Sequence, residues 1–373
     1  MLTILFIAGV IGILILAHEW GHFYSARRFG VRVDEFGVGF PPRLFSWVRR
    51  GVRYSLNLFP LGGFVKIFGE HGEGEGKSES FAARPAWQRL LMLSAGVGMN
   101  ILAAWIFFSI AAGVGIPQIQ DEAGEGVPVS VISVLPDSPA DRAGIKIGDQ
   151  ILEFRASSPP PVSEDVQRLV QGGGQAFSLR VETEQDVRDV AEAYRGEEIV
   201  LVVRRGSEVV EIALTPRIQV PQGEGPLGIA MARLVIVQSP WYQAPFEGAR
   251  MVVESVAMIG TTLGGMIVQL FRGRVESLGV AGPVGIFLYA RDLKDLGFSY
   301  LLQFAALISV NLAVLNVLPI PALDGGRILF LVIEKIKGGR LNPRFENMAH
   351  TVGFALLILL MAVVTYQDIR KIF

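Results

Sequence analysis

Two histidines and a glutamate lie close together near the start of the chain, in the stretch AHEWGHF. His18 and His22 are four residues apart, so on a helix both imidazoles lie on one face, about one turn from each other. They can therefore bind the same metal ion. Glu19 lies beside the first histidine, where its carboxylate can take a proton from a metal-bound water without binding the metal itself. The HExxH spacing predicts a hydrolytic zinc site of the kind found in zinc peptidases.

A catalytic zinc ion needs a third protein ligand and one open position. The chain has no cysteine, which excludes thiolate ligands, disulfides and cysteine nucleophiles. His71 lies in EHGEGEGKSES, a stretch rich in glycine and charge that we expect to be a solvated loop, and His350 opens a late apolar segment. Neither is a good candidate for the third ligand.

Asp324 is a better candidate, because it interrupts the apolar segment NVLPIPALDGGRILFLVIE. Pro319 and Pro321 forbid a continuous helix, and Gly325 and Gly326 permit close backbone approach, so a broken span can present the carboxylate. A carboxylate in a bilayer is expensive unless it is paired or bound to a metal. The plainer interpretation is a turn aspartate at the membrane edge, just as the histidine pair could simply mark the polar end of a span.

The elements that must position these residues are apolar. Hydrophobic residues make up 51% of the 373 positions, charged residues make up 18%, and the mean hydropathy is +0.44, which is typical of a membrane protein. A segment at 244–271 carries several charges, and we expect it to lie in or near the membrane interface. Four other segments are long enough to cross a bilayer: residues 2 to about 24, 90–116, 300–320 (running on to 333) and 348–366.

The charges of the loops predict an orientation. Residues 25–89 carry 11 Lys or Arg against 6 Asp or Glu, whereas residues 117–299 carry 16 against 24. The positive-inside rule places the first loop in the cytoplasm and the second outside. Both termini are then outside, and the histidines lie near the cytoplasmic face.

The outer segment has the order of elements of a small α+β domain. Alternating strands flank SPADRAGIKIGD, TEQDVRDVAEAY has helical spacing, and EEIVLVVRRGSEVVEIALTP indicates two strands joined at residues 205–207. This order resembles a PDZ domain over residues 127–218. Residues 156–180 look like an insertion with a short helix and a flexible glycine tract. GPLGI at 225–229 could form a turn that binds a peptide carboxylate, or could be a linker.

HEWGH in a first span, NVLPIPALDGGR in a late span and a PDZ-like segment between them resemble the bacterial site-2 proteases of the regulator-of-sigma-E protease type, which are M50-like peptidases. The resemblance covers nearly the whole chain. It implies that His18, His22 and Asp324 ligate Zn²⁺ and that Glu19 is the general base. The best-known members carry two PDZ domains in tandem, and this chain has room for one.

The resemblance also bears on substrate binding, because a membrane helix must be unwound before it can be cut. Asn316 matches an asparagine that holds the substrate backbone in the family; alternatively it is a buried asparagine between helices. Asn100 has the helix-packing interpretation alone. Residues 52–68 predict a β-hairpin near the membrane whose edge an extended substrate could join. Gly62 and Gly63 lie at that approach, or are simply turn formers.

We therefore expect a polytopic α-helical membrane protein with about four transmembrane helices, a membrane-associated β-hairpin and one extracytoplasmic α+β PDZ domain. The expected function is intramembrane zinc proteolysis of transmembrane segments, in anti-sigma factors or leftover signal peptides, at a bacterial inner membrane. Expected partners are such substrates, a peptide or truncated ectodomain at the PDZ domain, and lipid, with no nucleic acid. The alternatives are a PDZ-bearing receptor or scaffold and a metal-ion transporter. The expected division is residues 1–126 and 300–373 for the membrane core, 127–218 for the PDZ domain, and 219–299 for a linker with an interfacial helix.

Overall fold

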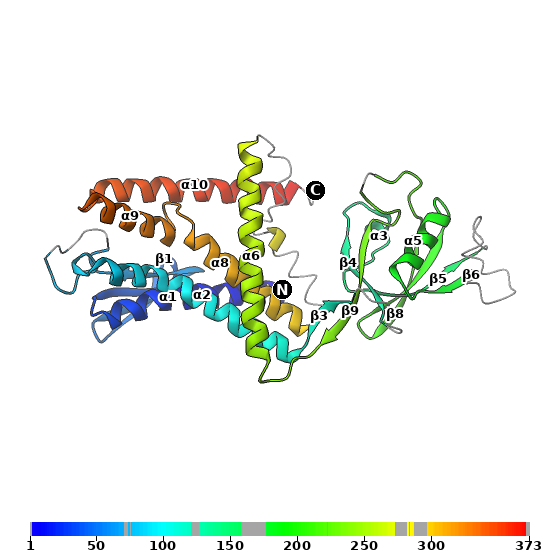
Figure 1. Cartoon of the computed structure of the whole chain (residues 1–373), viewed down its shortest axis with the longest axis horizontal. Helices are drawn as coiled ribbons and strands as arrows, with labels where there is room; N and C mark the ends of the chain where they lie inside the picture. The colour runs from blue at the N-terminus through cyan, green and yellow to red at the C-terminus, as the bar shows by residue number, and fades with distance from the viewer. Residues whose placement is uncertain are drawn as a thin grey trace. The chain divides into compact units, whose positions relative to one another are not determined.

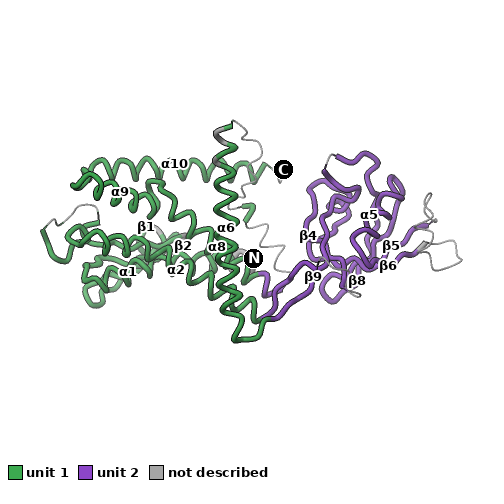
Figure 2. Tube along the Cα trace, viewed as in Figure 1, with its two compact units in different colours: residues 1–113, 239–290, 301–373 green, residues 114–238, 291–300 purple. Residues whose placement is uncertain are grey.

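The computed structural model of the chain is drawn in Figure 1. It divides into two compact units, coloured separately in Figure 2: unit 1 comprises residues 1–113, 239–290 and 301–373, and unit 2 comprises residues 114–238 and 291–300. The structure describes residues 2–70, 74, 76–120, 127–157, 177–221, 223–272, 282, 284–286 and 297–370.

The described residues include four helices, mostly within unit 1, that are long and apolar enough to cross a membrane, which confirms the four predicted spans. In Figure 1, α2 runs beside α1, and α9 (Asp324–Lys337) runs beside α10. α1 ends at Arg27 and Arg28, whose charges complement the carbonyl end of the helix. The four are α1 (Leu2–Arg28), α2 (Ala86–Val114), α8 (Phe298–Val317) and α10 (Pro343–Arg370).

The predicted break in the third span is present. α8 ends at Val317 and α9 begins after six intervening residues, so Asp324 is the first residue of a new helix. A Cβ atom on Gly325 would lie 2.2 Å from the carbonyl oxygens of Val317 and Leu318. The glycine is required there because the two helices approach each other through backbone atoms. α9 ends at Gly338, which takes the left-handed conformation typical of a C-terminal cap.

Two long strands follow α1 and form an antiparallel pair, β1 (Val33–Arg49) and β2 (Val52–Ile67). The register is doubled, because residues 35–38 of β1 pair with residues 53–56 and also with residues 63–66 of β2. β2 bends between these two parts, where Gly62 has φ of 121°. The hairpin predicted within residues 52–68 is therefore wrong in its pairing, because both parts of β2 pair with β1 and not with each other. A β-hairpin is present, but its first strand is the preceding segment, β1. A short 3₁₀ helix, η1 (Phe81–Ala83), leads into α2.

The segment at 244–271, expected in or near the membrane interface, forms α6 (Ala244–Phe271), which is not among the candidate spans. In Figure 1 it runs across the direction of α2 and α10. Its first turns pack on α2, where the indole nitrogen of Trp105 donates to the carbonyl oxygen of Pro245 at 2.9 Å. A Cβ on Gly248 would lie 2.3 Å from the Ser109 hydroxyl oxygen, so the two helices are in close contact. The interfacial location of α6 stays a prediction.

The described part of unit 2 is built on a seven-stranded sheet with the order β3-β9-β4-β5-β7-β8, and β6 pairs with β5. The helices α3 (Pro139–Arg142) and α5 (Glu184–Ala193) complete it. Its strands are β3 (Ile116–Ile119), β4 (Val129–Val134), β5 (Gln150–Ala156), β6 (Phe177–Arg180), β7 (Ile199–Arg205), β8 (Glu208–Leu214) and β9 (Ile229–Val237).

The local structure of unit 2 follows its sequence. The Thr183 hydroxyl and the Asp186 carboxylate form a capping box at the start of α5, so the predicted helix is confirmed. The hairpin at residues 205–207 joins β7 to β8 as expected. β9 comes from the stretch expected to be a linker and lies between β3 and β4. Most of the expected insertion, residues 158–176, lies outside the described residues.

Candidate metal centre

The histidine pair lies on the buried face of α1. His18 and His22 are 9% and 8% exposed, and their Nε2 atoms are 3.2 Å apart. A separation of four residues places the two rings one turn apart on the same side of the helix, as predicted. Both Nε2 atoms therefore face one point inside unit 1.

Asp324 meets this pair from the other end of the chain. Its Oδ2 atom lies 3.1 Å from Nε2 of His18 and 3.2 Å from Nε2 of His22. As the first residue of α9, it leaves the helix at the point where the backbone has just turned back from α8. Two segments about 300 residues apart thus bring three ligand atoms together.

The spacing of these atoms fits one zinc ion. Zinc bonds of about 2.0–2.2 Å in a tetrahedral site separate the ligand atoms by about 3.3–3.5 Å, and the three observed separations are 3.1–3.2 Å. Two nitrogens and one carboxylate oxygen also form a donor set that zinc prefers. Among the described residues this is the one group of three or more His, Cys, Asp or Glu side chains that could hold a metal ion.

Gly96 of α2 leaves the room that an ion would need. A Cβ atom at this position would lie 2.4 Å from Nε2 of His22 and 2.8 Å from Nε2 of His18. It would press directly against both metal-facing nitrogens. Gly96 was not among the functional residues predicted from the sequence, although it lies in the small-residue stretch SAGVGMN that ends at Asn100.

The far side of each imidazole is held by α2. Nδ1–H of His22 donates to the carbonyl oxygen of Met92 at 2.9 Å, which leaves Nε2 free to bind a metal. Nδ1 of His18 lies 3.2 Å from the amide nitrogen of Asn100, whose amide oxygen is buried without a partner in the described part of the chain. A half-turn of this amide lets the oxygen accept Nδ1–H and satisfies both groups. Asn100, expected to serve helix packing alone, therefore also orients His18.

Glu19 is half-buried on the same helix. Its carboxylate is close enough to His18, His22 and Asp324 to interact electrostatically with all three. On its other side lies β2, where a Cβ on Gly63 would be 3.2 Å from Cγ of Glu19. The carboxylate thus lies between the cluster of His18, His22 and Asp324 and a strand.

The remaining predicted residues are placed as follows. Gly63 is beside Glu19, and Gly62 forms the neighbouring bend of β2. Asn316 is half-buried near the end of α8, and no hydrogen bond joins its amide to the described residues. His350 lies on α10, and its Nδ1 accepts a hydrogen bond from the backbone N–H of Ala322. His71 lies outside the described residues.

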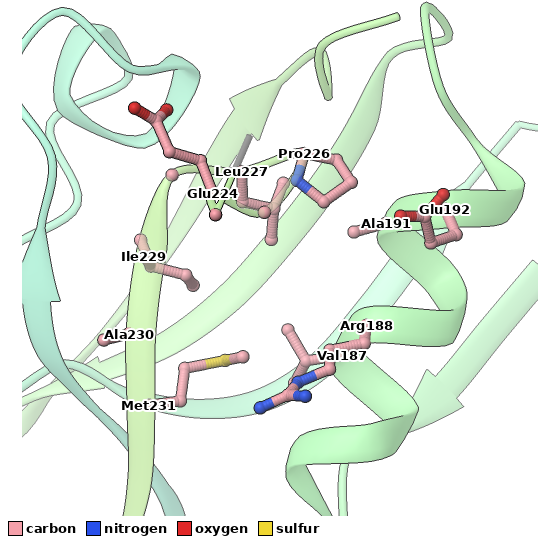
Figure 3. Close-up of a pocket in the computed structure, with 13 residues that line it drawn as sticks. Val187, Arg188, Ala191, Glu192, Glu224, Pro226, Leu227, Ile229, Ala230 and Met231 are labelled. Atoms are coloured by element: carbon pink, nitrogen blue, oxygen red, sulfur yellow. The ribbon is translucent and has the colours of Figure 1, made fainter. Parts of the chain in front are cut away.

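Unit 2 contains a separate pocket of about 420 Å³ between α5 and β9. Figure 3 shows Val187 of α5 facing Ile229 and Met231 of β9, with Pro226 and Leu227 at one end. The walls combine apolar side chains with the charged residues Arg188, Glu192 and Glu224, and the turn that contains GPLGI contributes to the lining. One side of the pocket is therefore a strand and the other is a helix.

A carboxylate beside two imidazoles and one aspartate is an arrangement that a metal-dependent hydrolase can use. Residues 6–360 match the model of peptidase family M50, and the chain belongs to this family. It is 28% identical to the zinc metalloprotease RasP of Geobacillus kaustophilus, an alignment that covers 98% of this chain and 97% of the relative. It is also 28% identical to the regulator of sigma-E protease RseP of Salmonella typhimurium, with 97% of both chains covered. The protein is an intramembrane zinc metalloprotease of regulated intramembrane proteolysis.

Proposed function

We propose that His18, His22 and Asp324 hold the zinc ion and that Glu19 is the general base in the hydrolysis of a peptide bond within another protein's transmembrane segment. One observation carries the proposal: three ligand atoms from the two ends of the chain lie within 3.2 Å of one another, beside the Glu19 carboxylate. Bound zinc supplies a Lewis acid that polarises the scissile carbonyl and lowers the pKa of water towards neutrality.

Proton transfer and orientation of the ligands are the roles of the neighbouring residues. Glu19 accepts the proton of the attacking water and delivers it to the nitrogen of the departing amine. Met92 and Asn100 keep the histidine rings in one orientation, so the ligand nitrogens do not need to reorganise during the reaction. The half-buried position of Glu19 shields this proton transfer from bulk water.

The substrate helix has to be extended before it can be cut, and β2 supports a way to hold it. Residues 63–66 pair with β1 on one side, and within the described ranges no second strand pairs with their other side. An unwound substrate can add to this edge as a further strand. Gly63 then lets the substrate backbone approach Glu19, and the bend at Gly62 ends the edge. The Asn316 amide, which has no partner in the described residues, is available to bind a substrate peptide group.

Unit 2 is proposed to be an extracytoplasmic PDZ domain that selects substrates. The strand and helix that line its pocket suit an extended peptide, with the terminal carboxylate at the turn of residues 225–229. Its ligand would be the new end of an ectodomain that another protease has already shortened. If this gating operates, deletion of residues 127–218 permits the cleavage of substrates with long ectodomains; if such substrates stay uncut, the gating proposal is wrong.

The loop charges support an orientation with β1 and β2 on the cytoplasmic side of a bacterial inner membrane. The outer half of the hairpin exposes large apolar side chains that suit contact with lipid: Leu44, Phe45, Trp47 and Val48. The relative named a regulator of sigma-E protease supports an anti-sigma factor as one substrate class. Leftover signal peptides are a second class with the same chemistry, a single apolar helix.

The variant Glu19→Gln tests the proposal. It keeps the shape of the side chain and removes the base, so we expect one zinc per chain and loss of cleavage of a helical substrate in proteoliposomes. Unchanged cleavage would contradict the role of Glu19. Zinc flux into empty liposomes, or peptide binding without cleavage by the parent protein, would instead favour a transporter or a scaffold.

A further inference from the structure

The loop that carries Asp324 has an unusual backbone shape. It spans residues 318–323, between α8 and α9. Ala322 has φ of 87°, a left-handed conformation that a residue with a Cβ rarely adopts and that costs roughly 1–3 kcal/mol. A loop in this conformation persists only where its surroundings hold it. Because Asp324 follows two residues later, the same constraint determines where its carboxylate lies.

α10 contacts this loop at two points. The backbone N–H of Ala322, the left-handed residue, donates to Nδ1 of His350 at 2.9 Å. Three residues further along α10, a Cβ on Gly353 would lie 2.2 Å from the carbonyl oxygen of Pro321. Residues three apart share a helix face, so α10 presents one hydrogen-bond acceptor and one gap to two consecutive residues of the loop.

Few of the described residues of α10 are buried, and one of them packs against this loop. Among its described residues, Gly353 and Asp368 alone are buried. Gly353 is the one that packs against the loop, and Asp368 accepts a hydrogen bond from the backbone N–H of Gly285. The His350 ring also packs edge-on against Phe330 of α9, with 5.5 Å between the centroids. The same face of α10 therefore contacts both the loop and the helix that Asp324 begins.

We propose that α10 is a brace for the third zinc ligand, with His350 and Gly353 as positioning residues that do not touch the metal. The inference rests on the proposed function, because it takes Asp324 to be a zinc ligand. Without the His350 acceptor, the Ala322 N–H loses its partner in a low-dielectric surrounding, and the loop can relax out of the left-handed conformation. A zinc site tolerates errors of about 0.2 Å in its ligand distances, so even a small shift of Asp324 weakens the binding.

The test uses the full-length protein in detergent and measures the rate of zinc release to a chromogenic chelator, together with kcat and KM. His350→Leu removes the acceptor, and Gly353→Ala pushes on Pro321 from the second contact. We expect each to accelerate zinc release about 10- to 100-fold and to lower kcat more than it raises KM. His350→Asn, whose amide oxygen replaces Nδ1, is expected to stay within about threefold of the parent protein.

Thr351→Ala is the matched control. This neighbour of His350 is exposed, and its hydroxyl bonds to the Asn347 carbonyl of its own helix, so zinc release should be unchanged. Wild-type release in both His350→Leu and Gly353→Ala would overturn the proposal. So would equal acceleration by Thr351→Ala. If His350→Leu does not fold, Gly353→Ala with the His350→Asn comparison still decides the outcome.

A double-mutant cycle separates the brace from the metal site itself. We expect His350→Leu to accelerate zinc release no further once Asp324→Ala is present, because the brace acts through that carboxylate. Additive effects would overturn the brace. If Asp324→Ala alone leaves zinc release unchanged, the ligand assignment of the proposed function is wrong. If Asp324→Ala accelerates release and the α10 variants do not, the brace alone is wrong.

Discussion

Substitution of Gly96 by alanine should empty the metal site while leaving the protein folded. The added methyl carbon would lie 2.4 Å from Nε2 of His22 and 2.8 Å from Nε2 of His18, whereas favourable carbon contacts lie near 3.5 Å. The rings must therefore retreat by about 0.7–1.1 Å, several times the 0.2 Å that a zinc site tolerates. We expect zinc affinity to fall at least about 100-fold, or about 2.7 kcal/mol.

Gly98→Ala controls for the helix itself. Gly98 lies two residues further along α2, and a Cβ there meets nothing within 4 Å. Both substitutions raise helix propensity by the same amount, up to about 1 kcal/mol, so their difference reports the contact with the histidines. The assay is competition for zinc with chelators of known affinity, with circular dichroism as a check on folding. Equal zinc affinity in the two variants would refute the inference that Gly96 leaves the room that the ion needs beside the two histidines.

Three further predictions concern other parts of the molecule. Gly63→Val should keep zinc but lower kcat/KM on the order of 10- to 100-fold in the proteoliposome assay, because a side chain there fills the space beside Glu19. An unchanged rate would exclude the approach of the substrate backbone to Glu19 past residue 63. Arg205→Leu should destabilise unit 2 by about 3 kcal/mol, since it removes the one ion-pair partner that the buried Asp149 carboxylate has among the described residues, a guanidinium bonded to it at 2.7 and 2.8 Å, and leaves it the Lys146 N–H. Arg155→Leu is the control: its exposed guanidinium pairs with Glu153 and Glu211, and its loss should cost under about 1 kcal/mol in the same thermal melts. Burial and then the charge of Glu197 raise the pKa of Tyr194 to about 12. The protonated phenol therefore stabilises the folded state fully below pH 10, and up to about 3 kcal/mol of the free energy of unfolding is lost as the pH rises towards 12. Tyr194→Phe should melt with a flatter alkaline pH dependence, and identical profiles would contradict the shift.

The residues of the candidate metal centre could be singled out from the sequence because each breaks a local rule. Two histidines and a glutamate at the end of an uncharged run, and an aspartate between prolines and glycines in another, contradict the pattern of a plain span. The spans themselves were predictable from length and hydropathy. Helix α5 and the hairpin turn of unit 2 were equally local, since the spacing of apolar residues and Gly206 act within a few residues of their own positions.

The remaining features depend on contacts between distant segments. Nothing local distinguishes Gly96 from Gly98, and only the approach of α2 to α1 makes one of them part of the site. Asn100 has the pattern of a helix-packing residue until His18 is placed beside it. β9 takes its place between β3 and β4 through ladder partners about 100 residues away, and the spacing of apolar residues does not identify those partners. His350 likewise has no local signal for its bond to Ala322.

Zinc K-edge X-ray absorption of the purified protein, compared with Asp324→Ala, tests the central claim most directly, because it counts the ligands that the two ends of the chain contribute to one ion. The claim predicts one zinc per chain, bound by two imidazole nitrogens and a carboxylate oxygen. In Asp324→Ala it predicts a changed oxygen contribution and reduced zinc occupancy. A full complement of zinc with an identical spectrum in that variant would contradict it.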